Sequence, residues 1–173
     1  MSGRSRARWG WHRLTDPFAA QVAAASGVGR GDLVLDLGAG DGAITRHLVG
    51  SGAQVIAFEL HPARVAELRA RFPQARVVRT DITDLRLPRR PFVVVANPPF
   101  DGVSAVLTRL THRHSRLTRA DLVVPVSVAA RWSDRLATGT WQLTLRHRLP
   151  RTAFVPPPRV DCCAVRIERR PGR

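Results

Sequence analysis

The sequence predicts an α/β protein of the Rossmann-like type with a mostly parallel sheet, and three observations carry this prediction. Short apolar runs alternate with segments of helical period along the chain, which is typical of parallel strands joined by crossover helices. A glycine-rich turn at residues 38–42 separates the first apolar run from a helix. Acidic or amide side chains directly follow successive apolar runs, at the strand ends where such sheets bind ligands.

The chain has 173 residues, of which 44% are apolar and 24% are charged, and this is enough for one domain with a core. Residues 1–13 are interpreted as a basic N-terminal arm and residues 14–173 as a single catalytic domain, without an internal repeat or an interdomain linker. Asp16 and Pro17 open the first helix, with Asp16 as its N-cap and Pro17 in its first turn. This helix is expected to run to about residue 25.

The remaining elements follow from the same alternation of apolar runs and helical periods. Strands are expected at residues 32–37, 53–59, 76–80, 92–96, 121–125, 141–149 and 160–167. Helices are expected at residues 43–50, 62–71, 102–111 and 129–136. The two late strands are expected to pair antiparallel, so the prediction is a seven-stranded, mostly parallel sheet with an antiparallel last strand. Three consecutive prolines make the connection at residues 151–159 a stiff loop.

The charge of the chain indicates a polyanionic partner. Basic residues number 28 and acidic residues 13, for a formal charge of +15, and every basic residue is arginine. Genomic base composition accounts for the choice of arginine over lysine but does not require so large an excess of positive charge. A cluster formed by Arg109, His112, Arg113, His114, Arg116 and Arg119 fits either a solvated helix end or a grip on phosphates.

Metal, disulfide and membrane chemistry are not expected. Cys162 and Cys163 are adjacent, so they face opposite sides of a strand and are interpreted as small buried hydrophobes in a reducing cytosol. The histidines show no metal-ligand spacing. The N-terminus lacks the apolar core of a signal peptide, and no apolar run approaches the roughly 18 residues that span a membrane. We therefore expect a soluble cytoplasmic protein.

The string Asn97-Pro98-Pro99-Phe100, directly after the apolar run 92–96, indicates methylation of an amine. An exocyclic amine of adenine or cytosine is a poor nucleophile because its lone pair is delocalised into the ring. The side-chain oxygen of Asn97 and the carbonyl of Pro98 can accept both amine hydrogens and localise that lone pair. The ring of Phe100 can stack on the base. Asn97, Pro98 and Phe100 are therefore the predicted catalytic residues.

The methyl donor is expected at the upstream strand ends. Position 43 is alanine, so the glycine-rich turn departs from the dinucleotide fingerprint. Asp36 and Asp41 place acid beside this turn, which suits a cationic sulfonium ligand with an amino group better than a pyrophosphate. Glu59 can hold a ribose diol, and Asp81 with Ile82 can take the amine and the face of an adenine. The predicted cofactor is S-adenosyl-L-methionine.

Taken singly, each of these features also fits a structural role. A glycine-rich turn is often only a turn, Glu59 can cap the helix that begins near residue 62, and Asp81 can cap a turn. Their ordered combination, completed by Asn97-Pro98-Pro99-Phe100 at the fourth strand, favours S-adenosylmethionine-dependent methyl transfer.

Residues 11–167 resemble the rRNA adenine N6-methyltransferases of the macrolide, lincosamide and streptogramin B resistance family, and more distantly the adenine dimethyltransferases of ribosome biogenesis. The resemblance lies in Leu14-Thr15-Asp16, in residues 36–42, in Glu59, in Asp81-Ile82 and in Asn97-Pro98-Pro99-Phe100. The discriminating segment is residues 154–161, in which an aromatic residue precedes a proline run and Val-Asp. Two departures are Trp11-His12-Arg13, where this family usually has a Gln-Asn-Phe string before Leu14, and Pro98, where a branched aliphatic residue is common.

The resemblance implies a class I methyltransferase fold and a set of cofactor contacts. These fall on His12, Leu14, Asp36, Gly38, Ala39, Gly40, Glu59, Leu60, Asp81, Ile82 and Asn97. Typical members continue into a small helical domain that helps to bind RNA, so this chain resembles a short member without that domain. Its RNA contacts are then expected from the N-terminal arm, the 151–159 loop and surface arginines, namely Trp11, Arg151, Phe154 and Arg159.

The expected substrate is an adenine of 23S rRNA, free or in a ribosomal precursor particle, and its methylation by a monomeric enzyme would confer macrolide-type resistance. Several alternatives remain open. The same site serves rRNA adenine dimethylation in ribosome biogenesis, DNA amino methylation and methylation of a glutamine in a translation factor, and a non-catalytic RNA-binding module is a reading from a different class. Phe154 can pack in the core instead of stacking on a base, and Trp11 can belong to a solvated tail.

Overall fold

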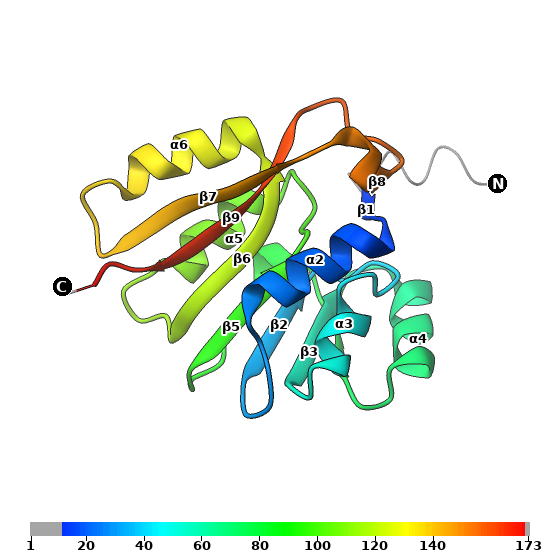
Figure 1. Cartoon of the computed structure of the whole chain (residues 1–173). Helices are drawn as coiled ribbons and strands as arrows, with labels where there is room; N and C mark the ends of the chain where they lie inside the picture. Colours follow the sequence, from blue (N-terminus) through cyan, green and yellow to red (C-terminus); the bar gives the residue numbers. More distant parts are fainter. Residues whose placement is uncertain (1–11, 172–173) are drawn as a thin grey trace.

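The computed structural model describes residues 12–171 and confirms the predicted fold class. A seven-stranded sheet with the order β4-β3-β2-β5-β6-β9-β7 crosses the molecule, with helices on both of its faces (Figure 1). Strand β9 runs antiparallel to both of its neighbours, whereas the pairs from β4 to β6 are parallel. The expected antiparallel last strand is therefore present, one position in from the sheet edge.

The observed bounds lie close to the predicted ones for most elements. The strands of the large sheet are β2 (Leu33–Leu37), β3 (Gln54–Glu59), β4 (Arg76–Arg79), β5 (Phe92–Ala96), β6 (Leu117–Pro125), β7 (Trp141–Leu149) and β9 (Cys162–Arg169). The helices are α2 (Asp16–Ser26), α3 (Thr45–Gly50), α4 (Pro62–Arg71), α5 (Val103–Leu110) and α6 (Val126–Leu136). Short elements are β1 (Arg13–Leu14), η1 (Ile82–Asp84), η2 (Arg151–Ala153) and β8 (Phe154–Val155).

Two local predictions are corrected. Strand β6 begins four residues earlier than expected because Leu117 pairs with Phe92 at the start of β5. Asp16 is the first residue of α2 and not its N-cap, which is Thr15 without a side-chain bond. The carboxylate of Asp16 instead accepts a hydrogen bond from His47 Nε2 at 2.9 Å and pairs with Arg46 at 3.2 Å.

The central strands bury side chains on both faces, which explains their continuous apolar runs. In β2, Leu33, Leu35 and Leu37 face a core that contains α5 and α6, whereas Val34 faces a core that contains α2, α3 and α4. The same alternation with period two occurs in β5. Two cores therefore hold the three layers together and fix the strand ends that carry the site.

The order of the strands brings the two sequence motifs together. Strands β2 and β5 are neighbours in the sheet, although β3 and β4 lie between them in the chain. The sheet order reverses at this point, and ligands of open α/β sheets bind in the crevice at the carboxyl ends of such strands. The glycine-rich turn follows β2 and Asn97 follows β5, so both motifs lie at this crevice.

A small two-stranded sheet joins the N-terminal segment to the late proline loop. Strands β1 and β8 pair antiparallel, with Arg13 opposite Val155 and Leu14 opposite Phe154, and the Thr15 N–H donates to the Ala153 carbonyl at 2.8 Å. This pairing lies beside the carboxyl ends of the large sheet (Figure 1). Within the described part of the chain, no helix combines the length and the apolar character needed to cross a lipid bilayer.

Candidate active site

Asn97 is held in one orientation by the N-terminal segment. Its Nδ2 donates a hydrogen bond to the His12 carbonyl at 2.7 Å. Its Oδ1 is buried and has no partner among the described residues. Buried polar atoms are nearly always hydrogen-bonded, and a carbonyl-type oxygen can only accept. Asn97 Oδ1 is therefore prepared to accept a hydrogen bond from a ligand.

The ring of Phe100 is stacked against the ring of His12. The His12 ring stacks on Phe100 with 5.4 Å between ring centroids and an interplanar angle of 25°. His12 Nδ1 lies 2.9 Å from the Pro156 carbonyl oxygen, which can only accept, so Nδ1 carries the hydrogen. His12 thus reaches the site through both its backbone and its ring, from the position where the sequence predicted a cofactor contact.

The glycine-rich turn and the Asn97–Phe100 segment are in direct contact. Gly38 has a φ of +75°, and a Cβ built on it would lie 2.6 Å from Pro99 Cδ. The N–H groups of Gly38 and Ala39 both lie 2.9 Å from the Phe58 carbonyl and donate to it, which ties the turn to β3. A side chain at position 38 would push the two motifs apart.

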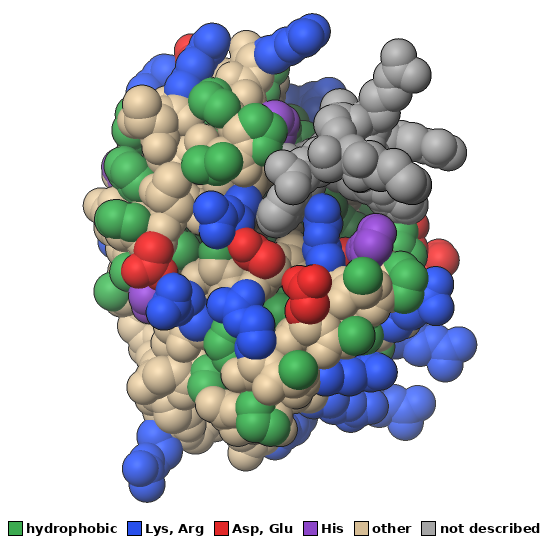
Figure 2. All heavy atoms as spheres, turned by 90° about the vertical axis from the view of Figure 1, so that its right-hand side faces the viewer, with side chains coloured by type: hydrophobic (Ala, Val, Ile, Leu, Met, Phe, Trp, Pro, Cys, Tyr) green, Lys and Arg blue, Asp and Glu red, His purple; other side chains and the backbone are tan. Residues whose placement is uncertain are grey.

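A pocket of about 280 Å³ opens beside this contact. It is lined by Gly38, Glu59, Leu60, His61, Arg64, Thr80, Asp81, Ile82, Thr83, Pro99, Asp101 and Gly102. These residues come from the carboxyl ends of β2, β3, β4 and β5, and five of them were predicted as cofactor contacts. Figure 2 views the molecule from this side and shows acidic and basic side chains mixed on this face.

Glu59 organises the wall of the pocket. Its buried carboxylate accepts three backbone hydrogen bonds, from Gly40 N at 2.8 Å, Leu60 N at 2.9 Å and His61 N at 2.8 Å. A carboxylate has about four lone-pair sites, so roughly one remains for a ligand hydroxyl while these bonds persist. Gly40, predicted as a cofactor contact, serves Glu59 through its N–H and is not among the residues that line the pocket.

Asp81 and Ile82 form the opposite wall. Asp81 Oδ1 accepts hydrogen bonds from Thr83 N and Thr83 Oγ1, both at 2.8 Å, and caps η1. The carboxylate of Asp81 also lines the pocket, where it suits a donor such as an amine. Ile82 is buried, and a Cβ built on Gly102 would lie 2.7 Å from Ile82 Cδ1, so Gly102 gives this side chain its room.

A second, small hollow lies on the other side of Gly38. Its volume is about 20 Å³, and its walls are Arg13, Leu14, Asp36, Gly38, Ala39, Asp41, Ala43, Ile44 and Asn97. Asp41 Oδ2 pairs with Arg13 Nη1 at 3.1 Å, whereas Asp41 Oδ1 is buried without a partner among the described residues. Two unpaired acceptors, Asp41 Oδ1 and Asn97 Oδ1, therefore belong to residues of this hollow, which suits a ligand that donates hydrogen bonds.

Asp36 is a buried carboxyl group and not an exposed anion. It is 1% exposed, and its Oδ2 accepts a hydrogen bond from Thr45 Oγ1 at 2.6 Å. Burial, reinforced by the nearby Glu59, raises the pKa of Asp36 to about 7, although the bond from Thr45 opposes the rise. The expectation that Asp36 offers a full negative charge to a sulfonium is therefore replaced by a group that is partly protonated near neutrality.

We expect Asp36→Asn to remove a pH-dependent cost of folding. Because the folded pKa is raised, the folded protein binds more protons than the unfolded chain between about pH 4 and pH 7, so the contribution of Asp36 to stability falls as pH rises through this window. Between pH 4.5 and pH 8 the variant should gain on the order of 3 kcal/mol relative to the parent. Urea unfolding at both pH values measures this difference, and parallel pH profiles would contradict it.

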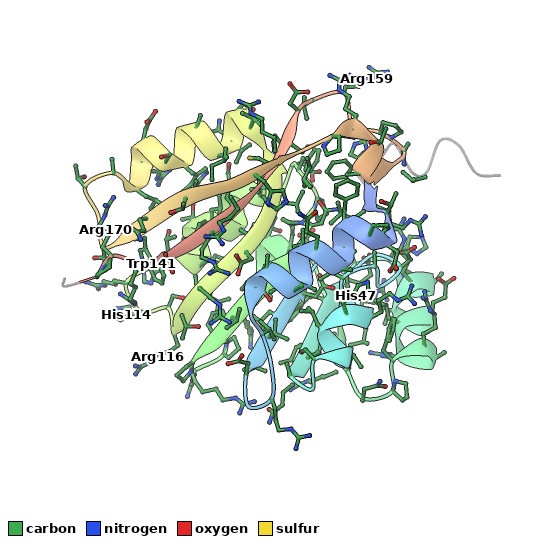
Figure 3. All side chains as sticks on the ribbon, viewed as in Figure 1. His47, His114, Arg116, Trp141, Arg159 and Arg170 are labelled. Atoms are coloured by element: carbon green, nitrogen blue, oxygen red, sulfur yellow. The ribbon has the colours of Figure 1, made fainter. Side chains whose placement is uncertain are left out.

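The residues predicted to contact RNA differ in their exposure to solvent. Phe154 is 1% exposed and packs in the core opposite Leu14, so it does not present its ring to a base in this structure. Arg151 and Arg159 are both exposed at the proline loop, and Figure 3 labels Arg159 there. Arg151 pairs with Asp161 at 3.5 Å. Trp11 lies outside the described residues. No cluster of metal-ligating side chains occurs within residues 12–171.

Several residues that shape the site were not predicted from the sequence. Thr45 bonds Asp36 from the first turn of α3, and Arg13 pairs with Asp41 across the small hollow. Asp101 and Gly102 join the pocket wall because the chain turns back at Pro99, where the Gly102 N–H donates to the Pro99 carbonyl at 3.1 Å. Each of these contacts depends on the fold of a loop and not on a local pattern.

Comparison with known proteins identifies relatives with the same fold and similar sequences. A family profile described as ribosomal RNA adenine dimethylase matches residues 3–173. The mycinamicin-resistance protein MyrB of Micromonospora griseorubida is 38% identical over 146 residues, which cover 79% of this chain and 47% of that protein. Ribosomal RNA small subunit methyltransferase A of Synechococcus sp. (strain JA-2-3B'a(2-13)) is 31% identical over 192 residues, covering 96% of this chain and 68% of that protein.

Solved structures agree on the fold. The crystal structure of the 23S rRNA methyltransferase ErmE superposes with a TM-score of 0.81 at 24% identity, over 91% of this chain and 70% of that one. The chain spans about half the length of two of the curated relatives that it matches.

Proposed function

The chain belongs to the ribosomal RNA adenine dimethylase family, and on this premise we propose that it is an S-adenosylmethionine-dependent methyltransferase acting on N6 of an adenine in 23S rRNA. The observation that carries the proposal is the buried, unpartnered Oδ1 of Asn97 beside the stacking ring of Phe100. An oxygen fixed in this way can accept an amine hydrogen and has no bond to another described residue to give up.

The two hollows fit the parts of S-adenosylmethionine, which when bound supplies a methyl group on an electrophilic sulfonium. In the larger pocket the remaining acceptor site of Glu59 suits a ribose hydroxyl, and Asp81 Oδ2 and Ile82 suit the amine and the face of an adenine. In the small hollow Asp41 Oδ1 suits an amino group. A volume of about 20 Å³ holds roughly one water, so the part-exposed Arg13 side chain must move to admit the amino-acid end.

The residues of this chain activate the amine by holding it. Asn97 Oδ1 accepts one amine hydrogen and the Pro98 carbonyl accepts the other, which returns the lone pair to the nitrogen. Phe100 is proposed to fix the plane of the base, and its stack with the planar His12 ring supports this role. His12 is a positioning residue, because its carbonyl binds Asn97 Nδ2 and so aims Oδ1 at the substrate.

No dedicated base is needed for this reaction. The amine becomes acidic only as it acquires positive charge, so its proton can leave to water after the new bond forms. Most of the acceleration comes from the fixed alignment of the nucleophile with the methyl group. The contacts of Asn97 and Phe100 supply this alignment from the protein side.

An rRNA substrate is supported by three features. The formal charge of +15 suits a polyanion, the family profile covers nearly the whole chain, and the resistance relative is 38% identical. We infer from the last of these that methylation of 23S rRNA in the cytoplasm confers macrolide-type resistance. The second candidate is adenine dimethylation of small-subunit rRNA, which the 31% identity across 96% of the chain favours.

Methyl transfer from labelled S-adenosylmethionine to 23S rRNA, 16S rRNA and duplex DNA, compared side by side, tests the proposal. We expect label in 23S rRNA, a primer-extension stop in the macrolide-binding region, and acquired resistance in a sensitive host. Label only in 16S rRNA would favour the second candidate, and label only in DNA would refute both. Absence of cofactor binding by calorimetry would indicate a non-catalytic RNA-binding module.

A further inference from the structure

A second basic surface lies at the edge of the sheet opposite the candidate active site. Two hollows of about 440 Å³ and 680 Å³ meet at His114, Ser115 and Arg116, where β5 and β6 begin and β9 ends. We call these two hollows together the amino-edge groove. Figure 3 shows its labelled members His114 and Arg116 on the side of the molecule away from Arg159 and His47.

The charge of the amino-edge groove is of one sign. Its walls contain six arginines and two histidines, namely Arg86, Arg89, Arg109, Arg113, Arg116, Arg169, His112 and His114. Among the described residues that line it, none is an aspartate or a glutamate. The face that carries the candidate active site differs, because acidic side chains lie among its arginines (Figure 2).

The arginines of the groove form two groups. In one group the side chain is hydrogen-bonded to a backbone carbonyl, and in the other the side chain is a free cation. Arg109 Nη1 donates to the Leu85 carbonyl at 3.3 Å, and Arg169 Nη2 donates to the Ser115 carbonyl at 3.2 Å. These two bonds fix the segments that precede β5 and β6. The side chains of four others, all exposed, make no hydrogen bond or ion pair to any described residue, and these are Arg86, Arg89, Arg113 and Arg116.

The segments that carry the free cations are anchored in the core. Leu85 and Leu117 are each 2% exposed, and Ser115 is 7% exposed. The Ser115 N–H donates to the His112 carbonyl at 2.9 Å, and the Leu117 N–H donates to Ser115 Oγ at 3.2 Å. The backbone positions that carry these arginines are therefore fixed, and little backbone ordering is needed when a ligand binds.

The chemistry of the groove favours phosphates over bases. Guanidinium groups form planar forks that match phosphate oxygens, and a row of them fits successive phosphates of one polymer. No phenylalanine, tyrosine or tryptophan is among the described residues that line the groove, and its aromatic surface is confined to the imidazoles of His112 and His114, so cations outnumber surfaces on which a base could stack. We propose that the amino-edge groove binds the phosphodiester backbone of a structured RNA, as a site separate from the methylation site.

This inference rests on the proposed function, because it assigns the groove to a remote part of the RNA that is methylated. Strand β5, Phe92–Ala96, separates the groove from Asn97, and five strand residues span about 17 Å. The nucleotide at Asn97 and the phosphates in the groove therefore belong to different parts of the RNA. A folded substrate with a second helix gains affinity from the groove, whereas a minimal hairpin does not reach it.

A matched pair of double variants tests the groove. Arg86→Gln/Arg116→Gln removes two free cations from it, and Arg131→Gln/Arg135→Gln removes two exposed arginines from α6. Binding of a 30-base-pair RNA duplex is measured by fluorescence anisotropy at several salt concentrations. The groove variant should bind about 10-fold or more weakly at low salt, and its salt slope should fall by about two, one for each lost phosphate contact. The α6 variant should stay close to the parent.

The outcomes separate this inference from the proposed function. If the parent transfers no methyl group but the groove variant alone loses duplex binding, the proposed function fails and the groove assignment stands. If both variants bind the duplex equally well, the groove assignment is overturned. If poly-glutamate competes as strongly as the duplex, the groove is an acidic-protein site and the RNA assignment is also overturned. With a folded 23S rRNA fragment as substrate, the groove variant should raise KM and leave kcat and cofactor binding unchanged.

Discussion

Asn97→Ala should lower methyl transfer by about a thousandfold while S-adenosylmethionine still binds. The variant removes a buried side-chain acceptor at the end of β5 that has no partner among the described residues. Loss of one preorganised polar contact to the reacting group costs roughly 10²- to 10³-fold in rate, and the loss of alignment adds to this cost. Single-turnover transfer at saturating RNA measures the rate, and calorimetry measures cofactor affinity.

Two further variants separate this effect from a general loss of structure. Gln142→Ala also removes a hydrogen bond made by a side-chain amide, from Gln142 Nε2 to Glu168 Oε1 at 3.3 Å. Because Gln142 lies in β7, far from the site, this variant should transfer methyl groups at the parental rate. Asn97→Asp keeps an acceptor but places a carboxylate oxygen against the His12 carbonyl. This variant should transfer methyl groups more slowly than the parent because the hydrogen bond that orients the side chain is lost. Parental activity in Asn97→Ala would refute the catalytic role of this residue.

The sheet and most of the cofactor pocket could be predicted because both depend on local pattern. Buried parallel strands are continuous apolar runs, so residues 92–96 were bounded correctly from sequence alone. Their carboxyl ends meet at one edge of the sheet, and Gly38, Glu59, Asp81 and Ile82 accordingly line one pocket. The chemistry of each side chain then follows from its position at a strand end.

The contacts that could not be predicted join segments far apart in the chain. His12 and Asn97 are separated by 85 positions, and Leu14 and Phe154 meet only because β1 pairs with β8. That pairing buries Phe154, which was predicted as an RNA contact because it lies beside Arg151 and Arg159 in the proline loop. Burial of Asp36 likewise depends on Thr45 and on the layers above β2, and no pattern in its own strand reports the resulting rise in its pKa.

Gly38→Ala should cost both stability and activity, for two different physical reasons. A residue other than glycine at a φ of +75° costs about 1–2 kcal/mol of folding free energy. In addition, the new Cβ would lie 2.6 Å from Pro99 Cδ, and a proline ring cannot rotate away. The segment from Asn97 to Phe100 must therefore move, and a displacement of the order of 1 Å costs about 100-fold in rate.

Gly52→Ala separates the two reasons, because Gly52 has a similar φ of +81° but its new Cβ would meet nothing closer than Arg30 Cβ at 3.9 Å. Both variants should lose stability in urea unfolding because both place alanine in the left-handed region, and Gly38→Ala should lose more because its Cβ also meets Pro99. Only Gly38→Ala should lose methyl transfer, because only its side chain meets the catalytic segment. Equal activity in the two variants would mean that the contact between the glycine-rich turn and Pro99 does not set the geometry of the reaction, and the assignment of residues 97–100 as a rigid acceptor for the amine would then fail.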